Sequence, residues 1–517
     1  MPDKLQERVN DALWDACDAL RGPVDSTNYK EYILPLLFYK YVSDVWRDER
    51  ERLEAEYVGD PDAETLVARK MGRLPFQVPT TFETIARKAP HDDDLGETLN
   101  KAFVELEEAN GERLADMFQS VDFNSPRLGD KREATERLRT LVATFDREVL
   151  DFRPSKLGKR RDVVGNAYMY LIQRFAEGAG KKGGEFFTPP EVSRLLARLV
   201  DPQPGDRLYD PTMGSGSLLI SVAEHLQHTH DTDDFALYGQ EINRDTWALA
   251  KMNAVLHDFP SAHFERGDTL AAPKHLESGG LMTFDVVVAN PPFSLKEWGY
   301  KRAELDAQGH NRYHRGLPPK TRGDFAFISH MMASVVRDGG RMGVVVPHGV
   351  LFRGGREGTI REALIRENLL EAVVGLPEKL FYGTGIPAAF LLFRYGKPTE
   401  DVLFVDASAD FEAGTRQNKI RDDVESQRVV DALMAFRTDP AYDGEEKYAH
   451  RATFEEIEDN DFNLNVSRYV DTYEPEPLID LKAVQREVLG LERELADVRK
   501  EMDAALAALG LAIEDEN

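Results

Sequence analysis

The sequence contains a single cysteine, Cys17, among its 517 residues. One thiol cannot build an intrachain disulfide framework or a cysteine-rich metal site, which fits a reducing cytoplasm. Long apolar runs are also lacking, because stretches such as residues 33–38 are far shorter than the roughly 20 residues that cross a bilayer. The N-terminus is polar and charged, unlike a signal peptide. We therefore expect a cytoplasmic protein without a membrane segment.

Positive charge is scarce as well. Lysine and arginine total 65 against 92 aspartates and glutamates, so the formal net charge is −27. Proteins that bind nucleic acid without a partner usually carry a basic face, because neutralisation of the phosphates supplies much of the binding affinity. A protein of this charge that acts on nucleic acid would therefore need its basic residues gathered on one face, or a partner that supplies most of the binding affinity. An acidic excess also fits a simple solubility role.

Two regions of different pattern make up the first four-fifths of the chain. Apolar residues at helical spacing predict an all-helical domain over residues 1–155, with Pro35 placed to kink its second helix. Residues 153–161 are basic and rich in turn formers, and we interpret them as a linker in preference to the alternative of a segment that faces phosphates.

Residues 156–410 begin with a helix over 163–175 and then alternate short apolar runs with helical segments. This alternation predicts an α/β fold with a doubly wound, mainly parallel sheet. The expected strands span residues 207–209, 235–239, 263–266, 284–289, 341–346, 371–374, 388–393 and 402–405.

The C-terminal part changes character twice. Residues 411–474 are mixed and polar, and we interpret them as a connecting region. Residues 475–512 carry a heptad seam typical of a coiled-coil-like helix. The seam consists of Leu481, Val484, Val488, Leu491, Leu495, Val498, Met502, Ala505 and Leu509. So narrow an apolar stripe needs a partner helix, and the pattern fits another chain or the N-terminal helices of this one.

The sequence Asn290-Pro291-Pro292-Phe293 follows the apolar strand predicted at 284–289. It therefore lies at the carboxyl end of a buried strand, where open α/β sheets bind ligands. The Asn290 amide and the Pro291 carbonyl offer two hydrogen-bond acceptors, and the second proline stiffens the loop. Phe293 adds a flat apolar face for a planar base. The loop thus suits polarisation of a planar amine, although Asn-Pro is also ordinary turn chemistry.

Three earlier strand ends carry a second set of candidates. Asp210 opens a glycine loop whose members Gly214, Ser215, Gly216 and Ser217 lead into a helix. Glycines permit close backbone approach, and a helix N-terminus offers unpaired N–H donors. Glu241 ends the next strand, where an acidic residue can bind ribose hydroxyls. Asp268 follows the third, where it can accept from an adenine amino group. Each acid alone is as easily a turn residue.

A further loop precedes the first strand. We expect Thr188 to be an N-cap, Pro189 the first helical residue, and Glu191 the partner that completes a capping box. The adjacent Phe186 and Phe187 are placed to wall an adenosyl or methionine pocket.

Taken in order, these motifs resemble those of the modification (methyltransferase) subunits of type I restriction-modification systems. The resemblance covers most of the chain and includes residues 461–469. It rests on Glu185-Phe-Phe-Thr-Pro-Pro190, Asp210-Pro-Thr-Met-Gly-Ser-Gly216, Gly239-Gln-Glu-Ile-Asn243 and Asn290-Pro-Pro-Phe293. Met213 departs from the smaller residue or cysteine often found there.

The resemblance implies a Rossmann-like methyltransferase domain that transfers methyl from S-adenosylmethionine to adenine N6 in duplex DNA. No metal is implied, and the base must leave the helix stack to react. The Asn290 amide and the Pro291 carbonyl would accept from N6–H, Pro292 would help to hold that carbonyl in place, and Phe293 would stack on the base. The implied donor-binding residues are Glu185, Phe186, Phe187, Thr188, Pro189, Pro190, Asp210, Gly214, Ser215, Gly216, Ser217 and Glu241, with Asp268 as our addition.

The resemblance also implies partners. A separate specificity subunit would recognise DNA, two copies of the modification subunit would clasp the duplex, and a restriction subunit could join them. The seam in residues 475–512 is then a candidate contact to the specificity subunit, and the N-terminal helices are candidates to close over DNA. Two alternatives remain from the residues: methylation of RNA or of a protein glutamine, and an inactive assembly scaffold.

Overall fold

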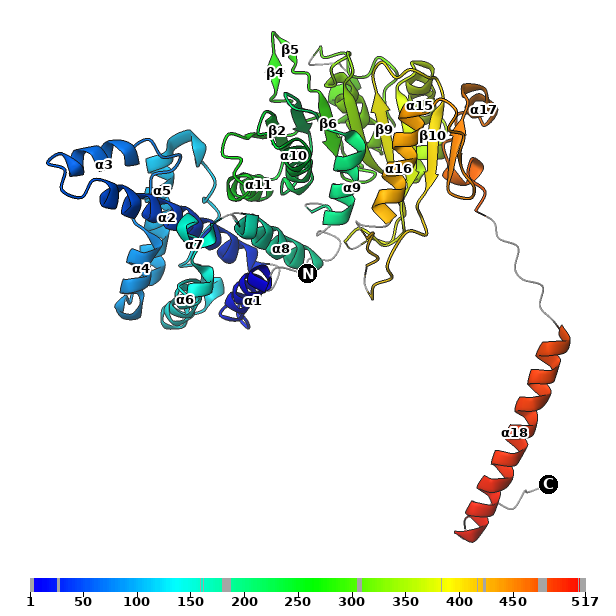
Figure 1. Ribbon diagram of the computed structural model, residues 1–517, viewed down its shortest axis with the longest axis horizontal. Helices are drawn as coiled ribbons and strands as arrows, with labels where there is room; N and C mark the ends of the chain where they lie inside the picture. Colours follow the sequence, from blue (N-terminus) through cyan, green and yellow to red (C-terminus); the bar gives the residue numbers. More distant parts are fainter. Residues whose placement is uncertain are drawn as a thin grey trace. The chain divides into compact units, whose positions relative to one another are not determined.

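A ten-stranded sheet with helices on both faces organises the middle of the chain in the computed structural model (Figure 1). The structure describes residues 4–25, 28–158, 160, 162–178, 187–304, 309–382, 384–415, 417–421, 425–472, 481–509 and 511. Residues 1–471 belong to one compact unit and residues 472–517 to a second.

The strand order places the first four parallel strands side by side. It runs β11 (Gly444–Glu445), β12 (Ala449–Ala452), β10 (Val402–Asp406), β8 (Leu370–Gly375), β9 (Ala388–Arg394), β7 (Arg341–Pro347), β6 (Val286–Ala289), β1 (Arg207–Asp210), β2 (Ala236–Glu241), β3 (His263–Arg266). The run from β3 to β7 is parallel throughout, as is the pair β8–β10. β9 is antiparallel to both of its neighbours, and β12 is antiparallel to β10 and β11.

All eight strands expected from the sequence are present, so the predicted α/β class is confirmed. The expectation of a merely connecting region over 411–474 needs correction, because β11 and β12 lie within it and extend the sheet. A small hairpin, β4 (Leu276–Glu277) with β5 (Gly280–Leu281), was also not expected. These strands have two to four residues, too few to produce a clear alternation.

Alternate residues of the central strands enter two different cores. In β6, Val286 and Val288 join one apolar cluster, whereas Val287 and Ala289 join the other. The first cluster continues into α9 (Pro190–Val200), α10 (Ser217–His230), α11 (Arg244–Leu256) and α16 (Glu425–Thr438). The second takes in α13 (Asp324–Ala333), α14 (Gly349–Phe352), α15 (Arg356–Arg366) and α17 (Phe454–Asp459). Burial on both faces explains why the strand sequences are continuously apolar.

The N-terminal region is helical, as predicted. Its helices are α1 (Lys4–Asp18), α2 (Lys30–Glu56), α3 (Ala63–Met71), α4 (Phe82–Lys88), α5 (Leu95–Asn110), α6 (Lys131–Phe145) and α7 (Pro154–Leu157). Pro35 is buried inside α2, which continues on both sides of it. Among the described residues, no helix is long and apolar enough to cross a membrane.

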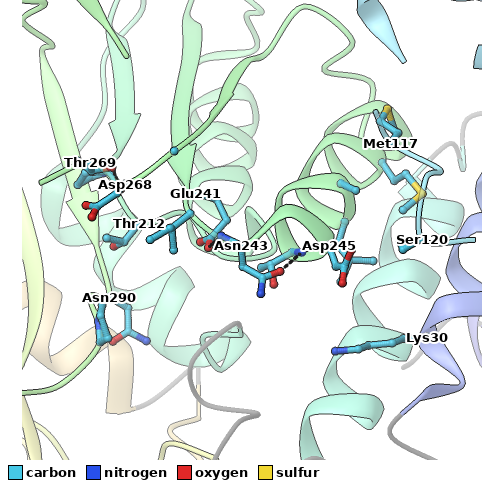
Figure 2. A pocket seen from close by; sticks show the side chains of 18 of the residues that line it. Lys30, Met117, Ser120, Thr212, Glu241, Asn243, Asp245, Asp268, Thr269 and Asn290 are labelled. Atoms are coloured by element: carbon cyan, nitrogen blue, oxygen red, sulfur yellow. Dashed lines mark hydrogen bonds between the residues drawn. The ribbon is translucent and has the colours of Figure 1, made fainter. Parts of the chain in front are cut away.

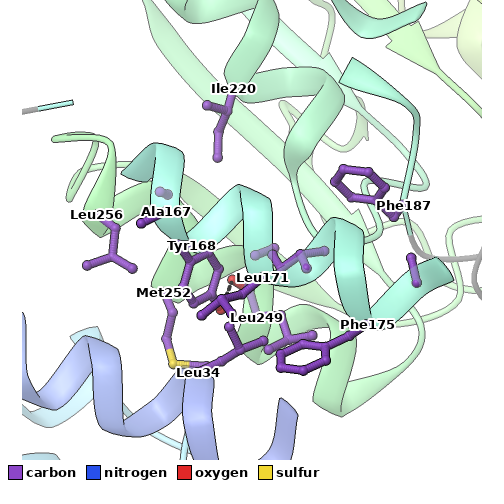
Figure 3. Packing of buried hydrophobic residues seen from close by; sticks show 14 of the residues in the cluster. Leu34, Ala167, Tyr168, Leu171, Phe175, Phe187, Ile220, Leu249, Met252 and Leu256 are labelled. Carbon is purple, nitrogen blue, oxygen red and sulfur yellow. Dashed lines mark hydrogen bonds between the residues drawn. The ribbon is translucent and has the colours of Figure 1, made fainter. Parts of the chain in front are cut away.

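Helix α8 (Asp162–Gly178) joins the N-terminal helices to the sheet region. Leu171 lies among Leu34 of α2 and Leu249 and Met252 of α11 (Figure 3), and all four belong to one continuous apolar cluster. The Tyr168 hydroxyl donates to the Leu249 carbonyl at 3.1 Å. The helical region and the sheet region therefore share an interior.

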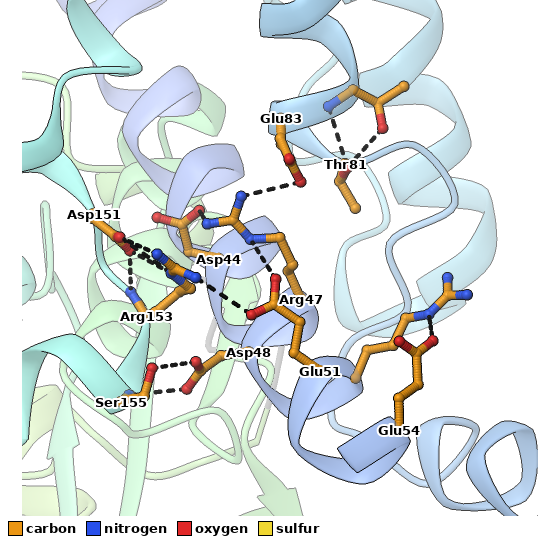
Figure 4. A network of polar contacts seen from close by, with 12 residues as sticks. Asp44, Arg47, Asp48, Glu51, Glu54, Thr81, Glu83, Asp151, Arg153 and Ser155 are labelled. Carbon is orange, nitrogen blue, oxygen red and sulfur yellow. Dashed lines mark hydrogen bonds and ion pairs between the residues drawn. The ribbon is translucent and has the colours of Figure 1, made fainter. Parts of the chain in front are cut away.

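The basic stretch interpreted as a linker is held against α2 by polar contacts (Figure 4). Arg153 pairs with Asp151 at 2.6 Å and with Glu51 at 3.3 Å. The Ser155 N–H donates to Asp48 at 2.9 Å. The charge of Arg153 is thus used within the fold, which favours a structural role over a phosphate contact for this residue.

Removing Lys40 should strongly destabilise the N-terminal helices. Lys40 and Asp44 form a buried ion pair in α2, and the Phe152 N–H donates to the same carboxylate at 2.9 Å. Lys40→Met would leave the buried Asp44 with only the more distant Arg47 guanidinium, 3.8 Å away, and breaking a buried ion pair by removing one partner typically costs about 3–5 kcal/mol. Urea unfolding followed by circular dichroism measures the loss. Lys101→Met removes an exposed pair with Glu105 and should cost under about 1 kcal/mol; equal losses would contradict the assignment.

The second unit contains the long helix α18 (Leu481–Ala508). This confirms the predicted C-terminal helix. None of its described residues is buried, and eight of the nine seam residues are exposed large apolar side chains: Leu481, Val484, Val488, Leu491, Leu495, Val498, Met502 and Leu509. An apolar stripe of this length is typical of a helix that pairs with another helix.

Candidate active site

The Asn290 loop begins where the buried strand β6 ends. Because β1, β2, β3 and β6 are parallel neighbours, Asp210, Glu241, Asp268 and Asn290 all lie at the same edge of the sheet. Glu241, Asp268 and Asn290 line a cavity of about 850 Å³ (Figure 2). The sequence prediction that these strand ends form one site is thus geometrically consistent.

The side chain of Asn290 is oriented by one hydrogen bond. Its Nδ2 donates to the Thr188 hydroxyl at 3.1 Å, which leaves Oδ1 as an acceptor. No group of the described residues donates to the Pro291 carbonyl. Asn290 Oδ1 therefore remains an available acceptor in the cavity lining, to which Pro292 also contributes, whereas Pro291 is buried and lies behind the lining residues.

The end of this loop is anchored on both sides. Phe293 packs edge-on against Phe381, with ring centroids 5.8 Å apart. Ser294 has a left-handed backbone, with φ of 52°, and its N–H donates to Asp324 Oδ1 at 2.8 Å. The Gly323 N–H donates to the Leu295 carbonyl at 2.9 Å. These contacts fix the direction in which the loop leaves the strand.

The expected capping box at Thr188 is wrong. The N-cap of α9 is Pro189, with φ of −53° and ψ of 137°, and Pro190 is the first helical residue. A proline at the first position loses no hydrogen bond, so the Pro-Pro pair sets the helix start one residue later than expected. The Thr188 hydroxyl is consequently free of capping and bonds to Asn290.

Phe187 is in the core rather than on the cavity. It is 2% exposed and packs against Tyr382, with ring centroids 5.9 Å apart. Glu185 and Phe186, also predicted as donor-binding residues, lie outside the described residues.

The glycine loop is tied to Glu241 by backbone donors. The N–H groups of Gly214 and Asn243 donate to the two Glu241 carboxylate oxygens at 3.1 and 2.7 Å. Burial raises the pKa of Glu241, and these backbone hydrogen bonds oppose the rise. Gly216 is the N-cap of α10, with φ of 77°, a conformation that glycine adopts without strain. Ser215 and Ser217 are buried behind the loop.

Asp210 stands behind the glycine loop. It is 1% exposed, and its Oδ1 accepts from the Thr212 N–H at 2.8 Å. Burial raises the pKa of Asp210 to about 8, with a smaller contribution from the nearby Glu241 charge. The carboxyl is therefore largely protonated at pH 7 and supports the loop, while Thr212 in front of it lines the cavity.

Asp268 lines the cavity and also holds its own turn. Its Oδ1 accepts from the N–H groups of Leu270 and Ala271, each at 3.0 Å. The Thr269 hydroxyl donates to the Pro211 carbonyl at 2.6 Å and so connects this turn to the glycine loop. One Asp268 oxygen is used structurally, as the turn interpretation expects, and the other is left for a ligand.

Several cavity residues escaped the sequence reasoning. Ile242 is 66% exposed and lies in the lining directly after Glu241. Its position directly after the acidic residue at the end of a strand could have predicted that Ile242 lines the cavity. Lys30, Met117 and Ser120 contribute from the helical region (Figure 2), and nothing in their local sequence indicates this.

Comparisons with known proteins agree with this geometry. Residues 159–477 match the N-6 DNA methylase family, and residues 9–145 match the HsdM N-terminal domain. The type I restriction enzyme MpnII methylase subunit of Mycoplasma pneumoniae is 29% identical, over 96% of this chain and 94% of that protein. The HindI methylase subunit of Haemophilus influenzae is 31% identical, over 74% and 84%.

A solved structure gives the same result for the fold. The type I restriction-modification methyltransferase subunit from Streptococcus thermophilus has a TM-score of 0.80 and 32% identity, covering 90% of this chain and 100% of that one. With the strand order, the four strand-end loops and both family matches in agreement, the chain belongs to the type I restriction enzyme methylase subunits of the N-6 DNA methylase family.

Proposed function

We propose that this chain transfers methyl from S-adenosylmethionine to adenine N6 in duplex DNA, as the modification subunit of a type I restriction-modification complex. The observation that carries the proposal is the Asn290 amide, whose Nδ2 donates to Thr188 and whose Oδ1 is thereby left as an acceptor. The adjacent Pro291 carbonyl accepts no hydrogen bond from the described residues. An exocyclic amine has two N–H donors, which this pair matches.

The residues around the cavity fit the methyl donor. Glu241 presents a carboxylate fixed by two backbone donors, which suits ribose hydroxyls. Ile242 offers exposed apolar surface for an adenine ring, and the second Asp268 oxygen can accept from its amino group. When bound, S-adenosylmethionine supplies an electrophilic methyl group on sulfur. No metal enters this proposal.

On the acceptor side, the loop would polarise the target amine. Asn290 Oδ1 and the Pro291 carbonyl would accept from N6–H and so increase electron density on the nitrogen. The new N–CH3 bond would replace the S–CH3 bond of the donor, which leaves as the neutral thioether, and N6 would lose one proton to solvent. The anchoring of Phe293 and Ser294 keeps these acceptors in place without reorganisation during transfer. A base within a duplex cannot reach this edge, so the adenine must be extruded.

The direct test is transfer of a tritiated methyl group. The full-length chain, purified with its specificity subunit, is incubated with labelled donor and either duplex DNA, RNA or protein. Label on adenine N6 of duplex DNA supports the proposal. Label on RNA or protein only favours the broader amino-methyltransferase function, and absence of donor binding by calorimetry favours an inactive scaffold.

Thr188→Val should lower kcat about fivefold and leave the donor Kd unchanged. Valine keeps the shape but removes the hydroxyl that orients the Asn290 amide, and one such hydrogen bond is worth about 1 kcal/mol. Thr188→Ser, which retains the hydroxyl, should restore most of the rate. A weakened donor Kd with normal kcat would instead assign Thr188 to the donor, as the family resemblance implies.

Assembly is the remaining part of the proposal. We place the specificity subunit against the exposed seam of α18, with a second copy of this chain in the complex and a restriction subunit as a further partner. Such a partner would also supply affinity for DNA, because the net charge of −27 on this chain repels the phosphates.

A further inference from the structure

We propose that a basic face beside the Asn290 loop holds the DNA phosphates next to the extruded adenine. This face is defined by Lys296, Lys301, Arg302, Lys320, Arg322 and Arg356. The inference rests on the proposed function and extends it, because it assigns part of the DNA contact to this chain rather than to a partner.

The local charge is opposite in sign to that of the whole chain. Residues 294–323 contain seven lysines and arginines and three aspartates and glutamates, in a chain with a net charge of −27. All six residues of the basic face are exposed. Basic residues are therefore gathered on one surface, which is one of the two solutions that the overall charge requires of a DNA-binding chain.

This surface is built rigidly onto the catalytic loop. Trp298 is 2% exposed, and its indole N–H donates to the Pro319 carbonyl at 2.9 Å. Arg356 donates to the Tyr300 hydroxyl at 2.8 Å, which joins the helix α12 (Tyr300–Glu304) to the start of α15. Together with the Ser294–Asp324 contact, these bonds place the basic face at a fixed distance from Asn290.

Most of these cations are not neutralised within the fold. Among the described residues, Lys296, Lys301, Arg302 and Lys320 make no ion pair, and Arg322 lies 3.7 Å from Glu357. In the N-terminal region, by contrast, Arg47, Arg52 and Arg153 each pair with at least two carboxylates. Solvated, unpaired cations release condensed counterions when they meet phosphates, which drives DNA binding.

The test uses the full-length chain purified with its specificity subunit, duplex DNA containing its site, and fluorescence anisotropy over a salt series. Lys301→Glu/Arg302→Glu should raise the DNA Kd at least about tenfold and reduce the salt slope by roughly 0.9 for each lost phosphate contact. Donor Kd and melting temperature should not change. The control Arg337→Glu reverses an exposed charge in the loop before β7, at the opposite edge of the sheet, and should leave the DNA Kd unchanged.

Failure of this inference is distinguishable from failure of the proposed function. If the wild-type complex methylates DNA but the double variant keeps its DNA Kd and salt slope, the basic face is not a phosphate contact. If the wild-type complex transfers no methyl group to DNA, the proposed function itself fails. An equal effect of Arg337→Glu would show a general charge effect and would also overturn the assignment.

Discussion

Asn290→Ala is expected to lower kcat by about 100- to 1,000-fold while the donor Kd stays within about twofold. Loss of one preorganised group that stabilises developing charge typically costs this much. The substitution removes the acceptor at the cavity edge and leaves Glu241, Asp268 and the glycine loop intact. Single-turnover methyl transfer measures the rate, and calorimetry measures donor binding.

Two outcomes would contradict the role given to Asn290. One is full activity of the alanine variant, which would leave the amide without a function in transfer. The other is loss of donor binding in parallel with activity, which would place Asn290 in the donor pocket only. Asn290→Asp is the informative companion, because it keeps an acceptor oxygen of the same size but removes the Nδ2 donor to Thr188, and it should fall between wild type and alanine.

The second large effect is expected at α18. Leu491→Glu/Leu495→Glu places two charges on the seam, where the wild-type side chains are 58% and 52% exposed. Each leucine buried in an interface contributes about 1.5–3 kcal/mol, so losing both should weaken assembly roughly 100-fold or more. Co-purification of the specificity subunit with the tagged chain should therefore be lost, while donor binding persists.

The same helix offers a matched control. Leu489 and Ala496 lie one heptad apart and off the seam, so Leu489→Glu/Ala496→Glu adds the same charge to α18 without touching the apolar stripe. This variant should still co-purify with the specificity subunit. Equal loss in both variants would indicate that added charge, rather than the seam, disrupts assembly, and unchanged assembly in the seam variant would remove α18 from the interface.

Much of the fold could be read from local pattern. The β-branched run that ends at Ala289 indicates a strand buried on both faces, and the structure buries all four residues of β6. The helix α18 was equally predictable, because a heptad repeat is a pattern of the local sequence. Strands β11 and β12 could not be predicted from the local sequence, because strands of two and four residues depend on pairing with a neighbouring strand, as β12 pairs with β10.

The sequence likewise predicted part of the site, namely which strand ends share one edge of the sheet. Order along the chain was enough to place Glu241, Asp268 and Asn290 on one edge, because parallel strands share their carboxyl ends. The bond between Thr188 and Asn290 joins residues 102 positions apart, so no local pattern could reveal it. The same holds for Lys30 and Met117, which reach the cavity only because the helical region packs beside it.

The apolar interior that α8 shares between the helical region and the sheet has a mechanical consequence. Closely packed side chains resist shear, so neither region can hinge against the other without opening that interior. If two copies of this chain enclose a duplex, as proposed above, each copy would then move as one rigid body. The sheet edge that carries Asn290 and the helices packed beside it would then approach the DNA together.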